Sequence, residues 1–460
     1  MGSAIIGEII LILAIIVLII KVPSVMLSVF MIGLVICIHE FGHFIMARVN
    51  GVIVEEFSIG FGPRLVSRKI RGTRWSLKLL PLGGSCMMKG EDTEENEGEG
   101  TFKSKSIWQR ISIIFAGPFF NFLLAFVLAC IIIGSIGYDA PTILTVDSEV
   151  EEKTGLAPDD EILEFNGHSI SIGREMAIYE QLDDIPKTIS LTVLHDGEEK
   201  TVEYDSVVTK RYLCGITYKL NPKGESNPMV LNDISGAAKD AGLQQGDIVI
   251  AVNGTKIDTP EAFQEYTQEK PIGPDPVTFQ IQRDGAVKDI TLTPKYSETV
   301  SFGFVYNVDY RTKVNPLKVI KYGAVEVEYW IKATVKSLGY MLKGKAEKED
   351  VGGAIRVVSE MSNVVEESKK QDGIFYAFLN LINWGILVSA NLGVMNLLPI
   401  PALDGGRLLF LLIELIIGHK VNPKVEGVIT FICFALLMLL MIFIMYNDIV
   451  NVFGAISRIP

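Results

Sequence analysis

The residues whose types and spacing point most directly to chemistry are His39, Glu40 and His43, which form the pattern His-Glu-x-x-His. They lie in the final third of an apolar run from Leu27 to Arg48. Residues four positions apart share one helix face, so two imidazoles can hold one zinc ion while the carboxylate acts on a water at the metal. Burying these groups in hydrocarbon is costly without a partner such as a metal, although neighbouring helices are an alternative partner. The pattern therefore predicts a zinc peptidase core inside a hydrophobic segment.

A second candidate group lies in a broken apolar segment near the end of the chain. The run from about residue 374 to residue 418 is longer than one span requires, and Pro399 and Pro401 interrupt it. Proline removes a backbone donor, and unwound backbone persists in a bilayer only where protein or a water-filled cavity receives it. Asp404, just after the prolines, is therefore predicted to be a functional intramembrane carboxylate. The alternative is a structural kink in which Asp404 pairs with Arg407.

The elements that must position these groups are membrane spans. The 460-residue chain is 49% hydrophobic and its apolar residues gather in long runs, which excludes an ordinary soluble protein. Further runs cover residues 4–20, 107–137 and 425–446. Residues 4–20 lack a basic start and a small-residue cleavage site, so a retained helix is favoured over a signal peptide. We expect four to five spans in total.

Small and polar residues mark the run at 107–137, which contains Ala116-Gly117-Pro118-Phe119-Phe120-Asn121. Small residues at this depth allow helices to approach closely, and a buried Asn can form an interhelical hydrogen bond. Packing accounts for these residues as well as catalysis does. His168, His195 and His419 lie in polar segments without ligand spacing, so we expect ordinary structural or surface roles for them.

Charge is distributed unevenly in this chain, whose net charge is −12. Residues 139–298 are strongly acidic, whereas the charged side chains of residues 64–78 are all basic. By the positive-inside rule, the loop after the first motif is cytoplasmic and the acidic region lies on the other side. Topology and lipid headgroups account for the basic stretch, so nucleic acid is not an expected partner. Within this stretch Arg71-Gly72 separates two short runs, which predicts a β-hairpin.

The polar middle of the chain contains an internal repeat. Residues 154–167 align without a gap on residues 241–254, sharing Gly-Leu, Asp and Asn-Gly at equivalent positions. Each copy is followed by an Asp-Gly pair between alternating strands, at residues 196–197 and 284–285, as two-residue hairpin turns require. The repeat predicts two small β-rich domains in tandem.

The second copy resembles PDZ domains through Ala241-Gly242-Leu243, Gly246-Asp247 and Val252-Asn253-Gly254. The first copy has Asp159 where Gly246 stands, and Asp tolerates left-handed backbone better than most residues, so this turn is expected to survive. The resemblance implies that an extended peptide can add to a sheet edge. A steric cap without peptide affinity is the alternative.

The order HEFGH, GPFFN, tandem PDZ-like insert and NLLPIPALDGG resembles the site-2 protease family of intramembrane zinc metalloproteases over nearly the whole chain. The apolar segment at residues 4–20 is a departure from that family's pattern. The resemblance implies that His39, His43 and Asp404 are the zinc ligands and that Glu40 is the catalytic base. It also implies that Asn396 contacts the substrate backbone or the oxyanion.

The same resemblance implies a polytopic α-helical membrane protein, with one span broken at Pro399-Pro401. The hairpin around Arg71 would be a re-entrant β-loop on the cytoplasmic side that holds substrate in extended form. The PDZ-like pair would be extracytoplasmic and admit only substrates that another protease has already trimmed. The expected organisation is an apolar helix (1–21), the HExxH span (22–48), the cytoplasmic-side loop and hairpin (49–106), a second span (107–137), two PDZ-like domains (138–213 and 214–300), an extracytoplasmic amphipathic helical region (301–373), the broken element (374–418) and a final span with the C-terminus (419–460).

The expected function is that of a zinc endopeptidase of the bacterial cytoplasmic membrane. It would cut transmembrane segments of single-span proteins, such as anti-sigma factors, in regulated intramembrane proteolysis. Its partners would be these substrates, the lipid bilayer and possible peptide ligands of the PDZ-like pair. Two other classes stay open: a catalytically silent scaffold that binds extracellular peptides, and a metal transporter. A transporter should show repeated halves of spans, whereas the repeat found here lies in the polar middle.

Overall fold

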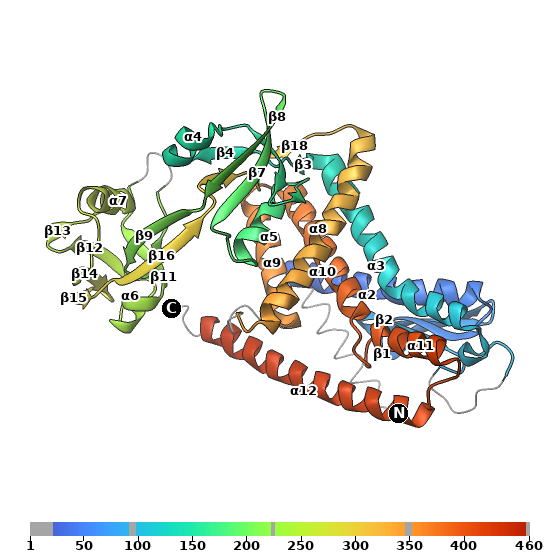
Figure 1. Ribbon diagram of the computed structural model, residues 1–460. Coiled ribbons are helices and arrows are strands. Elements are labelled where there is room, and N and C mark those ends of the chain that lie inside the picture. Colours follow the sequence, from blue (N-terminus) through green and yellow to red (C-terminus); the bar gives the residue numbers. More distant parts are fainter. Residues whose placement is uncertain (1–21, 92–97, 222–225, 346–351, 457–460) are drawn as a thin grey trace. The chain divides into compact units, whose positions relative to one another are not determined.

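The computed structural model describes residues 22–91, 98–221, 226–345 and 352–456 (Figure 1). The apolar segment at residues 4–20, expected to be a retained helix, lies outside the described residues, as does most of the acidic loop that follows the hairpin. The chain forms two compact units. The first, here called the membrane unit, comprises Met1–Pro141, Ile170–Asp183 and Asn307–Pro460. The second, the β-rich unit, comprises Thr142–Ser169 and Asp184–Tyr306.

Four described helices of the membrane unit are long and apolar enough to cross a bilayer. They are α2 (Pro23–Val49), α3 (Ile107–Ile136), α10 (Ile374–Leu397) and α12 (Pro423–Ile456). A helix rises about 1.5 Å per residue, so each exceeds the ~30 Å thickness of the hydrocarbon core. The prediction of a multi-span helical protein with β-rich domains is confirmed, while the total number of spans stays a prediction.

Helices α2, α3 and α10 pack closely because small residues line their contacts. A Cβ atom on Gly42 of α2 would lie 2.3 Å from the carbonyl oxygen of Ala116 in α3. Between α3 and α10, the hydroxyl of Ser389 in α10 donates to the carbonyl oxygen of Asn121 at 2.7 Å. The core between α3 and α10 includes the fully buried Ala125, Ala129 and Ala390. The small residues expected to allow close helix contact therefore do so.

The broken apolar element is observed as two helices with an unwound connection. Helix α10 ends at Leu397, residues 398–403 are not helical, and α11 (Asp404–Ile417) begins at Asp404. Pro399 and Pro401 lie in the connection, where they donate no backbone hydrogen bond. A Cβ atom on Gly405 or Gly406 would lie 2.2–2.3 Å from backbone oxygens of the connection, so it folds tightly over the first turn of α11.

The predicted hairpin is confirmed as two long antiparallel strands, β1 (Val54–Ile70) and β2 (Thr73–Met88). Its turn is Arg71-Gly72, with φ angles of 49° and 89°. Positive φ at both central residues is the geometry that matches the twist of a two-residue hairpin. Register shifts bend the hairpin between Val54 and Val66, and the last five residue pairs before the turn are regular.

The remaining described elements of the membrane unit are three helices, a short strand pair and a 3-10 turn. They are α8 (Pro316–Leu342), α9 (Ala354–Gln371), the short helix α5 (Glu175–Gln181), β3 (Tyr138–Asp139) with β18 (Arg311–Thr312), and η1 (Phe102–Ser104). Arg174, just before α5, pairs with Asp139 at 3.0 Å and Glu326 at 2.6 Å. Burial disfavours the charged guanidinium, but the two carboxylates outweigh burial and raise the pKa of Arg174. This ionic cluster fixes the segment around α5 against α8.

The β-rich unit contains two larger sheets, one from each copy of the internal repeat, and two two-stranded pairs. The first has the order β6-β5-β7-β8, and the second has the order β10-β11-β12-β14-β15 with β13 paired to β12. Their bounds are β5 (Glu161–Phe165), β6 (His168–Ser169), β7 (Thr188–His195) and β8 (Glu198–Asp205), then β10 (Ile216–Tyr218), β11 (Met229–Ile234), β12 (Ile248–Val252), β13 (Thr255–Lys256), β14 (Val277–Arg283) and β15 (Ala286–Leu292). The other elements are α4 (Ser148–Thr154), α6 (Gly236–Asp240), α7 (Pro260–Glu269), the pair β9 (Val207–Leu213) with β16 (Lys295–Ser301), and the pair β4 (Ile143–Val146) with β17 (Phe304–Tyr306).

Equivalent turns of the two repeats have the same backbone geometry. Asp159 has a φ of 72° where Gly246 has 89°, so the aspartate does adopt the expected left-handed conformation. The Asp-Gly pairs that begin at Asp196 and Asp284 have positive φ at both residues, which confirms the two predicted hairpin turns. The residues that the two copies share at these turns are therefore ones that tolerate φ above zero.

Candidate active site

The structure brings together three predicted site residues from two distant parts of the chain. His39 and His43 lie one turn apart on α2, and each is only 6% exposed. Asp404 is the first residue of α11. Its Oδ2 atom lies 3.0 Å from Nε2 of His39 and 3.2 Å from Nε2 of His43, and the two Nε2 atoms are 3.1 Å apart. Among the described residues this is the only cluster of three His, Cys, Asp or Glu side chains arranged to hold a metal ion.

The spacing of these three atoms fits a zinc site. Ligand atoms about 2.0–2.1 Å from a tetrahedral zinc ion are about 3.3 Å apart, close to the observed separations of 3.0–3.2 Å. The Oδ2 atom of Asp404 is buried and makes no hydrogen bond of acceptable geometry within the described residues, although both imidazoles are within ion-pair distance. Three ligand atoms that face one point, one of them a buried carboxylate oxygen without a hydrogen bond, suit a shared cation.

Glu40 lies beside this cluster and is held by the hairpin. The backbone N–H of Cys86 in β2 donates to Oε2 of Glu40 at 3.0 Å. Gly84, two residues before Cys86, lets β1 and β2 approach closely beside this contact, since a Cβ atom there would lie 2.8 Å from the Ser58 carbonyl oxygen. Glu40, Asn396 and the three clustered residues line one cavity of about 390 Å³. The predicted base and the predicted oxyanion contact therefore share a space with the candidate metal ligands.

Both imidazoles make a second contact through the nitrogen that faces away from the cluster. Nδ1 of His43 lies 2.9 Å from the carbonyl oxygen of Ile113, to which it donates. Nδ1 of His39 lies 3.2 Å from the side-chain amide of Asn121, which is fully buried. The interhelical hydrogen bond expected for Asn121 is thus observed, and its partner is a candidate metal ligand. Metal-binding histidines commonly donate their second N–H in this way, which sets the tautomer and the ring orientation.

Asn121 has a further property that fits a positioning role. Its Oδ1 atom is buried without a hydrogen-bond partner among the described residues. If Nε2 of His39 binds a metal, Nδ1 carries the hydrogen and needs an acceptor. Rotating the amide so that Oδ1 faces Nδ1 satisfies both atoms, and amide orientation is assigned from such networks.

We expect Asn121→Leu, which keeps the size but removes the acceptor, to lower zinc affinity by about 10- to 100-fold. Zinc affinity of the purified full-length protein would be measured by competition with a chelator. Asn121→Asp keeps an acceptor at the same place and should retain affinity. Equal zinc affinity in Asn121→Leu and the unchanged protein would exclude the positioning role.

Gly117 is a site residue that the sequence alone did not single out beyond its small size. A Cβ atom at this position of α3 would lie 2.3 Å from Nε2 of His43 and 2.8 Å from Cε1 of His39. The absence of a side chain therefore makes room for the two imidazoles. The signal in the sequence was the Gly-Pro-x-x-Asn run, which indicated close packing but not its partner.

Arg407, the alternative partner expected for Asp404, contacts another residue. The histidines outside the cluster also have other contacts. Arg407 forms an ion pair with Glu91, and both residues line the same cavity as Glu40. His195 lies 2.6 Å from the buried Asp160 in the first sheet. In the second repeat the equivalent pair is Arg283 with Asp247, also at 2.6 Å. His195 therefore takes part in a structural pair, in line with the expectation for histidines without ligand spacing.

Comparisons with known proteins show which family the chain matches. The family model described as Peptidase family M50 matches residues 27–440. The chain is 31% identical to the zinc metalloprotease RasP of Geobacillus kaustophilus, over 92% of this chain and 96% of that protein. It is 30% identical to the regulator of sigma-E protease RseP of Salmonella typhimurium and 32% identical to the protease RseP of Yersinia pestis, in each case over 90% of this chain and 96% of the relative. Among solved structures, the PDZ domain of EpsC from Vibrio cholerae aligns with 17% of this chain at 17% identity and a TM-score of 0.15, which assigns no fold. The chain therefore belongs to peptidase family M50.

Proposed function

We propose that this protein is an intramembrane zinc metalloendopeptidase that cleaves the transmembrane segments of single-span membrane proteins. The observation that supports this most strongly is the convergence of His39, His43 and Asp404 beside Glu40. This cluster lies among apolar helices of a multi-pass membrane protein. Membership of a peptidase family and relatives named zinc metalloproteases give the same reaction and the same metal.

His39, His43 and Asp404 would hold the zinc ion. Zinc bound there would supply Lewis-acid chemistry, polarising the scissile carbonyl and lowering the pKa of a water molecule. Glu40 is placed to accept a proton from the attacking water and to pass it to the leaving amine. The N–H of Cys86, 3.0 Å from Oε2 of Glu40, orients the carboxylate for this work. Asn396 would donate a hydrogen bond to the developing oxyanion.

The substrate must reach this site in extended form. Carbonyl groups of a transmembrane helix are hydrogen-bonded within the helix, so a segment has to unwind before attack. Strand β2 contributes Cys86 and Met88 to the cavity, so extended backbone already lies next to Glu40. We propose that the hairpin is a cytoplasmic-side re-entrant loop that receives the unwound segment. Helix-breaking residues near the scissile bond should then favour cleavage.

The β-rich unit would control which substrates reach the site. We propose that its two domains are PDZ-like and extracytoplasmic, and that they admit single-span proteins whose outer domain another protease has already removed. The turns shared by the two repeats support a common fold for both domains. The regulators of sigma-E among the relatives support a place in regulated intramembrane proteolysis at the bacterial cytoplasmic membrane, with anti-sigma factors as one substrate class.

The function would be tested with purified full-length protein reconstituted in vesicles with a single-span model substrate. We expect cleavage within the membrane segment, loss of cleavage on treatment with a zinc chelator, and recovery on addition of zinc. A matched substrate with an uninterrupted leucine segment should be cut more slowly than one with Gly-Pro in the segment. Cleavage that persists after complete zinc removal, or that falls only outside the membrane segment, would contradict the proposal.

A further inference from the structure

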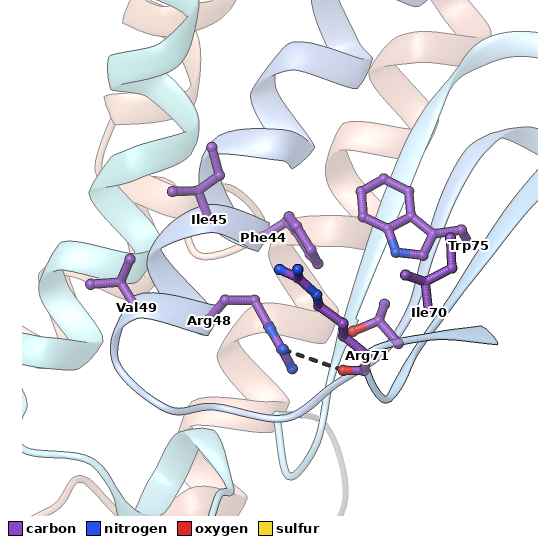
Figure 2. Close-up of a pocket in the computed structure, with 8 residues that line it drawn as sticks. Phe44, Ile45, Arg48, Val49, Ile70, Arg71 and Trp75 are labelled. Carbon is purple, nitrogen blue, oxygen red and sulfur yellow. Dashed lines mark hydrogen bonds between the residues drawn. The ribbon is translucent and has the colours of Figure 1, made fainter.

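A second site is formed where the end of α2 meets the turn of the hairpin. A groove of about 700 Å³ is lined by Phe44, Ile45, Arg48, Val49, Ile70, Arg71, Thr73 and Trp75. Figure 2 shows Arg48 and Arg71 between the helix and the hairpin, with the Nη2 group of Arg48 donating to the carbonyl oxygen of Arg71 at 3.3 Å. None of these residues lines the cavity that contains Glu40. We call this space the basic groove.

The basic groove contains positive charge without a carboxylate partner. No described carboxylate forms an ion pair with Arg48 or Arg71. Elsewhere on the same hairpin, Arg64 pairs with the buried Glu56 at 2.5 Å, and Lys78 lies 3.8 Å from it. Two guanidinium groups that share one groove repel each other unless an anion lies between them. The groove is therefore electrostatically suited to a negatively charged group.

A buried hydroxyl in the groove also has no partner. Thr73 is 1% exposed, and its Oγ1 atom makes no hydrogen bond within the described residues. Burying a hydroxyl without a hydrogen bond costs free energy, and native structures rarely leave such groups unpaired. Thr73 follows the turn directly, so Thr73 and Arg71 line the groove from the same end of the hairpin. A hydroxyl and two guanidinium groups together match the oxygen atoms of a phosphate group.

The rest of the groove is apolar and open to the surroundings. Val49 is 72% exposed and Ile70 is 46% exposed, while the Phe44 and Trp75 rings are in contact with centroids 5.0 Å apart. The groove lies at the C-terminal end of α2, which is long and apolar enough to span the bilayer. Lipid headgroups are expected at the end of a span, and Trp and Arg are typical of that level. An occupant here must combine an anion with hydrocarbon.

We propose that the basic groove binds an anionic phospholipid. The lipid phosphate lies between Arg48, Arg71 and Thr73, and its acyl chains follow the apolar side chains at the end of α2. Such a lipid joins the hairpin turn to the helix that carries His39 and His43. Strand β2 runs from this turn to Cys86, which contacts Glu40. Lipid binding would thus stabilise the hairpin in the position in which it orients Glu40.

Lipid binding would be tested on the purified full-length protein in detergent. Native mass spectrometry would follow titration with short-chain phosphatidylglycerol, short-chain phosphatidylcholine and inorganic phosphate. We expect phosphatidylglycerol to bind at least about fivefold more tightly than phosphatidylcholine, because one cation near an anionic headgroup gives about that factor. Inorganic phosphate should bind far more weakly than the lipid, since it lacks the acyl chains.

Three variants distinguish lipid binding in the basic groove from general attraction of the lipid to the positive charge of the hairpin. Arg71→Asn removes a guanidinium and suits a turn residue with positive φ, so the hairpin should still form. Thr73→Val keeps the shape and removes only the unpartnered hydroxyl, which leaves folding intact. Arg74→Gln is the control, because Arg74 lies between Thr73 and Trp75 and points to the opposite face of the strand.

We expect Arg71→Asn to weaken phosphatidylglycerol binding about fivefold and Thr73→Val about tenfold, with Arg74→Gln close to the unchanged protein. The proposal is overturned if Arg71→Asn and Thr73→Val bind the lipid as tightly as the unchanged protein. It is also overturned if phosphatidylcholine binds equally well, or if inorganic phosphate binds as tightly as phosphatidylglycerol. None of these readouts depends on peptidase activity, so they stand apart from the test of the proposed function.

Discussion

Replacing Glu40 with glutamine should abolish cleavage of a membrane substrate while leaving zinc bound. The carboxylate lies beside the three candidate ligands, and its Oε2 atom accepts a hydrogen bond from Cys86 at 3.0 Å. Glutamine has nearly the same shape but cannot take a proton from water. General acid–base catalysis contributes about 10²–10⁴-fold, and Glu40 would serve as base and then as acid, so we expect a loss of about 10³-fold or more.

Cleavage rate and zinc content of purified Glu40→Gln would be measured on the same preparation. Glu55→Gln, which changes an exposed carboxylate on the neighbouring strand, is the matched control and should behave as the unchanged protein. A cleavage rate close to normal in Glu40→Gln would show that Glu40 is not the catalytic base. Loss of zinc together with activity would instead place the carboxylate in the metal site itself.

Adding a single methyl group at Gly117 should also lower the cleavage rate strongly. The cause here is displacement of the two imidazoles and not loss of the base. The new Cβ atom would lie 2.3 Å from Nε2 of His43 and 2.5 Å from its Cε1 atom, well inside van der Waals contact. Both imidazoles would have to move, since His39 Cε1 is also within 2.8 Å. Displacing reacting groups by about 1 Å costs about a hundredfold in rate, and displaced ligands also bind zinc more weakly. We therefore expect Gly117→Ala to lose zinc as well as activity.

Gly134→Ala provides the control for this substitution. Gly134 lies on the same helix, and its added Cβ atom would come no closer than 4.0 Å to a neighbour, the Val319 side chain. Alanine favours helix over glycine by about 1 kcal/mol, so this variant should fold at least as well as the unchanged protein. Zinc analysis and cleavage would be measured on both variants. Retention of zinc by Gly117→Ala would contradict the packing argument for the imidazoles.

Features governed by short-range geometry were predictable from the residues alone. Helical periodicity brings His39 and His43 together without reference to the rest of the fold. The turns at Arg71-Gly72 and at the two Asp-Gly pairs follow from the few residues that tolerate positive φ. The unwound connection before Asp404 follows from two prolines in an apolar run.

The tertiary partners of these elements could not be predicted in the same way. The residues indicated that Asn121 would hydrogen-bond to another helix, but not that the partner is the His39 ring. Gly117 was visible as a small residue, whereas its place directly against His43 depends on how α2 and α3 cross. Periodicity defines which face of a helix is buried and gives no information about what covers it.

The charges of the hairpin show the same limit. The basic stretch was evident from composition, yet Arg64 is paired with Glu56 while Arg71 faces a groove with Arg48. Strand bulges and the approach of the turn to α2 create that difference, and neither can be predicted from the charge pattern.

The chemistry of this protein was therefore contained in its local sequence: a helix with two imidazoles and a carboxylate, and a distant carboxylate in an unwound segment. Folding alone decided that Asp404 meets His39 and His43 at 3.0–3.2 Å, and that Gly117 and Asn121 shape their surroundings. The physical reason is that local geometry depends on neighbouring dihedral angles, whereas contacts between remote segments depend on the packing of whole helices.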